Sequence, residues 1–157
     1  MGITTKTGDG GKTDLIGIRV AKTDVRLELI GTVDELLSAL SVANSFVTIK
    51  KYKDEIANCQ EALFAFNAQI AGAKLSDMEG FTNYFEDFIT KNESGAFSFS
   101  FVTKKAASFV DFCRTTARRA ERIFYKSEIN RRDLASFLNR ISDYLYVLSR
   151  LLESEEE

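Results

Sequence analysis

The stretch Asp133–Glu153 reads DLASFLNRISDYLYVLSRLLE, and it decides the fold class of this chain. Its apolar side chains recur every three or four residues, the spacing of one face of an α-helix: Leu134, Phe137, Leu138, Ile141, Leu145, Leu148 and Leu152. The pattern predicts a helix that begins near Arg132 or Asp133 and continues towards Glu153. The closing acidic residues, 154–157, are expected to form a solvated, frayed tail.

The same periodicity predicts four more helices, which we place at 24–46, 50–74, 76–91 and 104–127. Asp24 is suited to cap the first of them, and the chain contains no proline to interrupt any of them. The sequence therefore predicts one all-α domain over residues 1–157, built as an up-and-down five-helix bundle. Residues 1–23 are rich in Gly, Thr, Asp and Lys and are expected to be an ordered loop, with a short extended piece near Leu15.

Composition excludes several classes of protein. A net charge of −2 is unlike that of a general nucleic-acid binder, and no apolar run approaches the roughly 20 residues of a membrane span. The chain contains no histidine, which excludes Ser-His and Cys-His nucleophiles and His-ligated metal sites. Cys59 and Cys113 lie in apolar helical patterns and are expected to be buried free thiols, so we expect a cytoplasmic protein.

The segment Thr5–Thr13, TKTGDGGKT, is the first candidate binding element. Its glycines can turn consecutive backbone N–H groups towards one anion, and its threonines and lysines add donors. The segment is not a P-loop, because Lys6 occupies the position where that motif requires glycine. A flexible turn without function is the alternative interpretation.

Arg114, Arg118 and Arg122 are the second candidate, because a spacing of four residues puts them on one arc of a helix, with Arg119 at its edge. Such a row of like charges needs neutralisation. Two interpretations remain open. The partners are either carboxylates or a phosphate chain, which arginine can hold with two hydrogen bonds; the candidate carboxylates are Glu121, Glu28, Asp34 and Glu35.

Two further groups stand out. Asn139, Arg140 and Asp143 are polar neighbours within an apolar helix, which suits either a structural hydrogen-bond layer or a ligand contact. The connector before the arginine helix alternates Phe97, Phe99 and Phe101 with serine. It is expected either to pack over the end of the bundle or to form an apolar wall for a large flat ligand.

Taken together, these segments resemble the cobalamin adenosyltransferases of the PduO type. The likeness covers nearly the whole chain and rests on five motifs in the same order. They are TGDGGKT from Thr7, RVAKTDVR from Arg19, ELIGTVDEL from Glu28, RTTARRAER from Arg114 and NRISDYL from Asn139. One stretch departs from the family pattern: the F-x-L-P-G-G-like segment before the arginine helix has no Pro or Gly here.

The resemblance implies a homotrimer with ATP bound between neighbouring subunits, and magnesium held by the ATP phosphates rather than by a protein metal site. It implies that Arg118 and Arg122 serve catalysis together with Asp34, an acid that forms a salt bridge across the subunit boundary. It also implies residues for each ligand. ATP would contact Thr5, Thr7, Gly8, Asp9, Gly11, Lys12, Thr13, Arg19 and Lys22 of one subunit, with Arg118, Glu121, Arg122 and Asn139 of another; the corrinoid would face Phe99 or Phe101.

The implied reaction transfers the 5′-deoxyadenosyl group of ATP to cob(I)alamin and releases tripolyphosphate. Reduced cobalt is itself the nucleophile, so the absence of histidine is no obstacle, and a reductase partner is expected to supply it. Two alternatives remain at this stage. One is a non-catalytic ATP-binding trimer with a degraded corrinoid site, suggested by the altered connector. The other is a helical interaction module whose arginines all form structural ion pairs.

Overall fold

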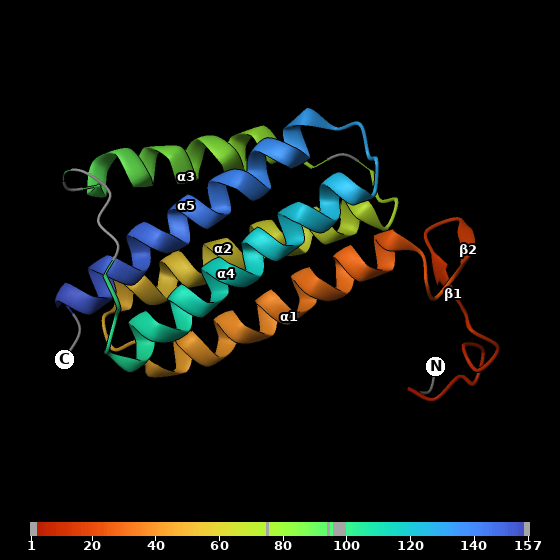
Figure 1. Cartoon of the computed structure of the whole chain (residues 1–157), viewed down its shortest axis with the longest axis horizontal. Coiled ribbons are helices and arrows are strands. Elements are labelled where there is room, and N and C mark those ends of the chain that lie inside the picture. The colour runs from red at the N-terminus through yellow and green to blue at the C-terminus, as the bar shows by residue number, and fades with distance from the viewer. Residues whose placement is uncertain (1–2, 75, 94, 96–99, 156–157) are drawn as a thin grey trace.

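The fold is a bundle of five long helices in a computed structural model that describes residues 3–74, 76–93, 95 and 100–155 (Figure 1). The helices run antiparallel to their sequence neighbours for most of the chain, and their bounds are α1 Val25–Phe46, α2 Lys50–Ile70, α3 Met78–Asn92, α4 Lys105–Lys126 and α5 Arg132–Glu155. The prediction of a five-helix bundle is confirmed. In the described part of the chain, no helix is long and apolar enough to cross a membrane.

Helix α5 owes its central position to the apolar face quoted first. It packs against α4 and α3, while α1 packs against α4 and α2. Four aromatic side chains with no exposed surface meet in the middle of the bundle: Phe66, Phe85, Phe137 and Tyr144. Ring centroids are 5.7 Å apart for Phe66 and Phe137, and 4.6 Å apart for Phe85 and Tyr144. Burial of each such side chain contributes about 1.5–3 kcal/mol, which fixes the helices that present the site.

Capping side chains determine where α1 and α3 begin. Asp24 caps α1 as expected, because its Oδ1 accepts the backbone N–H of Arg26 at 2.9 Å. The Arg26 guanidinium also binds this carboxyl, and the two contacts lower the pKa of Asp24 to about 2. Asp77 caps α3 through the N–H of Gly80 at 2.8 Å, so that helix begins at Met78 rather than near Ser76.

The prediction of a mostly irregular loop over residues 1–23 needs correction. An antiparallel hairpin forms from β1, Lys12–Leu15, and β2, Ile18–Ala21, with Leu15 opposite Ile18. Its two-residue turn, Ile16 and Gly17, needs a positive φ of 77° at Gly17, which glycine adopts at little cost. The Ile16 N–H donates to the Ala71 carbonyl at 2.8 Å and thereby docks the turn on the loop after α2.

The expected frayed tail is also partly wrong. Helix α5 continues through Ser154 to Glu155, and the Glu155 carboxylate binds the Lys51 ammonium at 2.7 Å. Glu153 accepts the backbone N–H groups of Thr103 and Lys104, each at 3.0 Å. The carboxylates near this end of the chain therefore tie α5 to α2 and to the start of α4. The last two residues of the expected tail, 156–157, lie outside the described residues.

Candidate functional site

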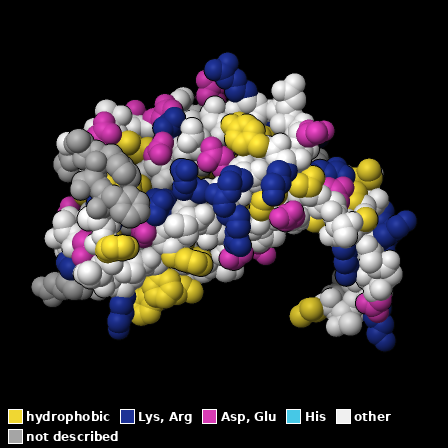
Figure 2. All heavy atoms as spheres, viewed as in Figure 1, with side chains coloured by type: hydrophobic (Ala, Val, Ile, Leu, Met, Phe, Trp, Pro, Cys, Tyr) yellow, Lys and Arg dark blue, Asp and Glu magenta, His cyan; other side chains and the backbone are white. Residues whose placement is uncertain are grey.

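Residues 3–22 form an N-terminal arm that projects from one end of the bundle (Figures 1 and 2). The two strands of the arm contact each other, and their backbones do not approach any helix closely. The contact of Ile16 with Ala71 holds the arm at its turn. Among the described residues, no hydrogen bond or ion pair joins the arm to α4 or α5. Within one chain, the arm and the arginines of α4 therefore do not form a common site.

The arm brings several of its predicted ligand-binding residues together. The Lys22 N–H donates to the Gly11 carbonyl at 2.9 Å, which turns the Lys22 side chain over Gly8. A Cβ at Gly8 would lie 3.2 Å from the Lys22 ammonium, so a larger residue there would push the end of the Lys22 side chain aside by a few tenths of an ångström. The Arg19 guanidinium donates to the Thr7 carbonyl at 2.5 Å and to Asp14 at 2.9 Å.

The remaining predicted residues of the arm surround these contacts. The hydroxyls of Thr5 and Thr7 are 2.9 Å apart, and Gly11 adopts a positive φ of 76° that lets the backbone turn back. Lys12 begins β1 with an exposed side chain, and Thr13 beside it is half-buried. Asp9 is exposed as well. The arm thus presents hydroxyls, backbone N–H groups and four cationic side chains, Lys6, Lys12, Arg19 and Lys22, to solvent, as an anion site requires.

The four arginines predicted to share a surface, Arg114, Arg118, Arg119 and Arg122, lie along α4 and are called the arginine face. Figure 2 shows Lys and Arg side chains gathered across the middle of the bundle over this helix. Two of the four have structural partners. Arg119 binds Glu35 of α1 at 2.5 Å, and Arg114 binds Asp111 one turn earlier at 2.8 Å.

The other two arginines are available to a ligand. Arg118 and Arg122 are exposed, and Arg122 donates to the Arg118 carbonyl at 3.2 Å. In the part of the chain that the structure describes, neither has an ion-pair partner. Asp34 on α1 is exposed and also lacks a cationic partner among those residues. The carboxylate interpretation of the arginine row is therefore right for Arg114 and Arg119, while the phosphate interpretation stays a prediction for Arg118 and Arg122. Asp111 is a partner that sequence reasoning missed.

Helix α5 adds a mixed polar group. Arg140 donates to Asp143 at 2.7 Å and to Glu86 of α3 at 3.0 Å, so its first task is to join α5 to α3. Asn139 is exposed, and its carbonyl accepts the Ser142 hydroxyl at 3.0 Å. Glu121 of α4 is half-buried. Arg140 and Asp143 therefore belong to a structural hydrogen-bond layer, which was one of the two interpretations of this group. The Asn139 side chain is exposed to solvent.

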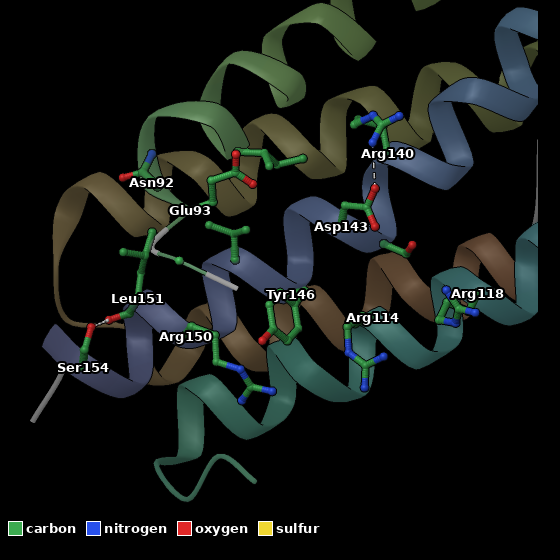
Figure 3. A pocket seen from close by; sticks show the side chains of 14 residues that line it. Asn92, Glu93, Arg114, Arg118, Arg140, Asp143, Tyr146, Arg150, Leu151 and Ser154 are labelled. Atoms are coloured by element: carbon green, nitrogen blue, oxygen red, sulfur yellow. Dashed lines mark hydrogen bonds and ion pairs between the residues drawn. The ribbon is translucent and has the colours of Figure 1, made fainter. Parts of the chain in front are cut away.

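A cavity of about 770 Å³ lies between α3, α4 and α5 (Figure 3). We call it the arginine pocket, since its walls include Arg114, Arg118, Arg140 and Arg150. Among the described residues that the sequence singled out, Arg114, Arg118, Arg140 and Asp143 line it. Sequence reasoning missed Arg150, although an arginine within the apolar run YVLSRLL is a signal of the kind that drew attention to Asn139.

A family model for cobalamin adenosyltransferases matches residues 3–152. The chain belongs to this family. The match begins in the N-terminal arm and ends near the end of α5, so it includes the arm, the arginine face and the polar group of α5.

Relatives and solved structures agree with the family match. The chain is 36% identical to the corrinoid adenosyltransferase PduO of Salmonella typhimurium, over 99% of this chain and 51% of that protein. It is 32% identical to a corrinoid adenosyltransferase of Citrobacter freundii, over 97% of this chain and 95% of that protein. The chain thus spans about half the length of the PduO relative but nearly all of the shorter one.

Among solved structures, this cobalamin adenosyltransferase family member resembles a variant PduO-type ATP:corrinoid adenosyltransferase from Lactobacillus reuteri, complexed with cobalamin and ATP. The TM-score is 0.88 at 27% identity, and the match covers 98% of this chain and 91% of that one. A second variant from the same organism, complexed with ATP, has a TM-score of 0.81 at 27% identity, over 98% and 94% of the chains.

For this family member, the segment expected to face a corrinoid is only partly described. Phe101 is 90% exposed, so it does not pack over the end of the bundle as one interpretation expected. Phe99 lies outside the described residues. Nearby on the surface, the rings of Phe46 and Phe109 stack with centroids 5.5 Å apart, and Phe112 is 51% exposed. Apolar surface is therefore present around the start of α4.

Protein ligands for a metal are not grouped in the described part of the chain, where no three Cys, Asp or Glu side chains are arranged to hold an ion. The two thiols are buried and free, as expected. Burial raises the pKa of Cys113 to about 12 and that of Cys59 further. Neither thiol is suited to act as a nucleophile, since the thiolate is the reactive form.

Proposed function

We propose that the protein transfers the 5′-deoxyadenosyl group of ATP to the cobalt of cob(I)alamin. The cobalt electron pair forms a bond to the ribose 5′ carbon while the bond from that carbon to the phosphate oxygen breaks, and tripolyphosphate leaves. The observation that best supports this is that the chain carries both an arm suited to bind an anion and two exposed arginines, Arg118 and Arg122, without an ion-pair partner in the described part of the chain. Family membership adds the substrate class.

The proposed site lies between two subunits of a homotrimer. The arm extends away from its own bundle and makes no polar contact with its own arginine face, so it is free to reach a neighbour (Figure 1). Asp34 is exposed and has no cationic partner in the described part of its own chain, so it is suited to form a salt bridge across the boundary. Burial of the exposed rings of Phe46 and Phe112 in such an interface would stabilise the trimer.

In this arrangement, Thr5, Thr7, Gly8, Asp9, Gly11, Lys12 and Thr13 would wrap the triphosphate together with Arg19 and Lys22. The second subunit would contribute Arg118, Glu121, Arg122 and Asn139 to hold the nucleotide. No side chain needs to act as a base, because cobalt attacks carbon. Alignment of the two reactants supplies up to about 7–11 kcal/mol, and the guanidinium groups stabilise the charge that develops on the leaving phosphate.

Magnesium fits this proposal as a companion of ATP. The phosphates of ATP would hold the ion. Bound there, it would neutralise part of the triphosphate charge. The hydroxyls of Thr7 and Thr13 are the arm's candidate ligands for such an ion.

The corrinoid would lie against Phe101, with Phe99 as the other predicted contact, and this apolar wall would exclude water from cobalt. A reductase partner would supply cob(I)alamin, and the buried free thiols agree with a reducing, cytoplasmic location. The connector without Pro or Gly supports a second candidate, an ATP-binding trimer that does not turn over.

The test is an anaerobic assay of the purified protein with chemically reduced cob(I)alamin, ATP and magnesium, with formation of adenosylcobalamin followed by its absorbance. We expect turnover that depends on ATP. Calorimetry with ATP and magnesium separates the remaining cases. Binding without turnover would favour the second candidate, and no binding would refute both.

A further inference from the structure

The end of α5 holds the segment that leads into α4, and both lie at the same end of the bundle (Figure 1). Glu153 accepts three hydrogen bonds from this segment. Its Oε2 accepts the backbone N–H groups of Thr103 and Lys104, each at 3.0 Å, and its Oε1 accepts the Thr103 hydroxyl at 2.7 Å. These contacts join residues about fifty positions apart in the sequence, so they fix the segment relative to α5.

Helix α4 has no cap of its own at this end. Its N-cap residue, Lys104, forms no side-chain capping bond, and the third helical residue, Ala107, cannot supply one. In a capping box a glutamate at that third position accepts the N–H of the N-cap residue. Glu153 accepts the same N–H from a different helix. The start of α4 therefore depends on α5 for a contact that many helices make locally.

Two further contacts hold the same segment. Val102 packs partly buried against the core, and its carbonyl accepts the Ser108 hydroxyl at 3.3 Å. The chain contains no proline, so no ring restricts φ in this segment. The position of residues 102–104 is thus set by the core, by Ser108 and by Glu153. Phe101 directly precedes these anchored residues and is 90% exposed.

We propose that Glu153 is a positioning residue for corrinoid binding, which fixes residues 102–104 so that Phe101 is in place before the corrinoid arrives. The proposal rests on the proposed function, in which the corrinoid lies against Phe101. Ordering a backbone segment costs conformational entropy, and a segment ordered in advance spares the ligand that cost. Glu153 acts only through the segment. Its contacts keep its pKa below the ordinary value, so the carboxylate is ionised at neutral pH and accepts strong hydrogen bonds.

The first measurement needs no ligand. Amide hydrogen exchange over residues 100–108 is compared in the wild type, Glu153→Met and the matched control Glu155→Met. Glu155 lies on the same helix, but its carboxylate binds Lys51 of α2 and not the segment before α4. We expect the N–H groups of Thr103 and Lys104 to exchange faster in Glu153→Met alone, because they lose their acceptor.

The second measurement is the affinity for cob(II)alamin, determined by equilibrium dialysis in the presence of excess ATP. This corrinoid has the same ring as cob(I)alamin but lacks the cobalt electron pair that attacks ATP, so nothing is turned over. If Glu153→Met leaves one backbone residue to be ordered on binding, the Kd for cob(II)alamin rises about 5- to 30-fold. We expect an unchanged Kd for ATP in this variant, and unchanged values for both ligands in Glu155→Met.

Two more variants separate positioning from a general loss of structure. Glu153→Gln keeps an acceptor for the two N–H groups, and the Thr103 hydroxyl can turn to accept from the amide, so most of the affinity should return. If Glu153→Met does not fold, Thr103→Val removes only the hydroxyl bond and should raise the Kd for cob(II)alamin by a smaller factor. In the anaerobic assay the change should appear in KM for cob(I)alamin, with kcat near that of the wild type.

Several results would overturn the proposal. Equal exchange at Thr103 and Lys104 in the wild type and Glu153→Met would do so, as would faster exchange with an unchanged Kd for cob(II)alamin. An equal rise in the Kd for ATP would also overturn it, since the substitution would then have loosened the whole site. A wild type that binds cob(II)alamin but does not adenosylate cob(I)alamin would refute only the transferase function, whereas one that binds no corrinoid would refute both.

Discussion

Arg118 and Arg119 are adjacent on α4 but are expected to respond very differently to the same substitution. Arg119 binds Glu35, and the two side chains are 45% and 50% exposed. An ion pair of that exposure contributes about 0–1 kcal/mol to stability. Arg119→Met should therefore lower Tm by no more than about 4 °C for a chain of this length and leave the transferase activity close to that of the wild type.

Arg118 has no ion pair within the described part of its own chain, so Arg118→Met should not lower the stability of the subunit. Removal of a charged hydrogen bond to the leaving phosphate costs about 1.5–3 kcal/mol. That loss corresponds to a fall of roughly 10- to 150-fold in kcat/KM for ATP. Both proteins are compared by thermal unfolding and by the anaerobic assay. Equal losses of activity in the two variants, or a low Tm confined to Arg118→Met, would refute the inference that Arg119 is structural and Arg118 binds the phosphate.

Three further outcomes are expected from groups outside the site. Tyr144→Phe should lower the free energy of unfolding by about 1–3 kcal/mol in urea, because the buried Tyr144 hydroxyl donates to Glu55 at 2.8 Å; no change would mean that this contact is absent. The pKa of Glu153 is below its ordinary value because the Lys104 N–H and the Thr103 hydroxyl bind its carboxylate. The contribution of Glu153 to the stability of the folded protein should thus be complete above pH 4.5 and be lost as pH falls through the lowered pKa. Melting curves across pH 3–6 should show this loss in the wild type but not in Glu153→Gln; identical curves for the two proteins would exclude such a contribution. Cys59 and Cys113 should fail to react with a thiol reagent until the protein unfolds, since burial raises both pKa values; fast labelling of the folded protein would contradict their burial.

The bundle was predictable because its signals are periodic and strong. The apolar stripes of α1, α2, α4 and α5 each continue over five or more turns, and Asp24 marks a helix start by a contact within its own turn. The hairpin was harder, since each strand has only four residues. Ile16 and Gly17 between the two runs KTDL and IRVA are nevertheless a recognisable turn signal.

The site could be predicted only in part, for a physical reason. Motif order identified the arm and the arginine face, but a motif does not say which arginine finds a carboxylate. Arg119 binds Glu35 only because α1 and α4 pack side by side, and Arg114 binds Asp111 within its own helix. The arginine pocket depends on three helices that meet in space, so the apolar run around Arg150 marks the residue as unusual but does not say what it faces.

The central claim is that the arm of one subunit and the arginine face of another form one site. It is tested most directly by mixing two inactive variants, Lys22→Met in the arm and Arg122→Met on α4, under conditions that exchange subunits. In a cyclic trimer with random mixing, about a quarter of the boundaries join an intact arm to an intact arginine face. The mixture should therefore recover about a quarter of the wild-type activity. No recovery, with subunit exchange confirmed, would contradict a site shared between subunits.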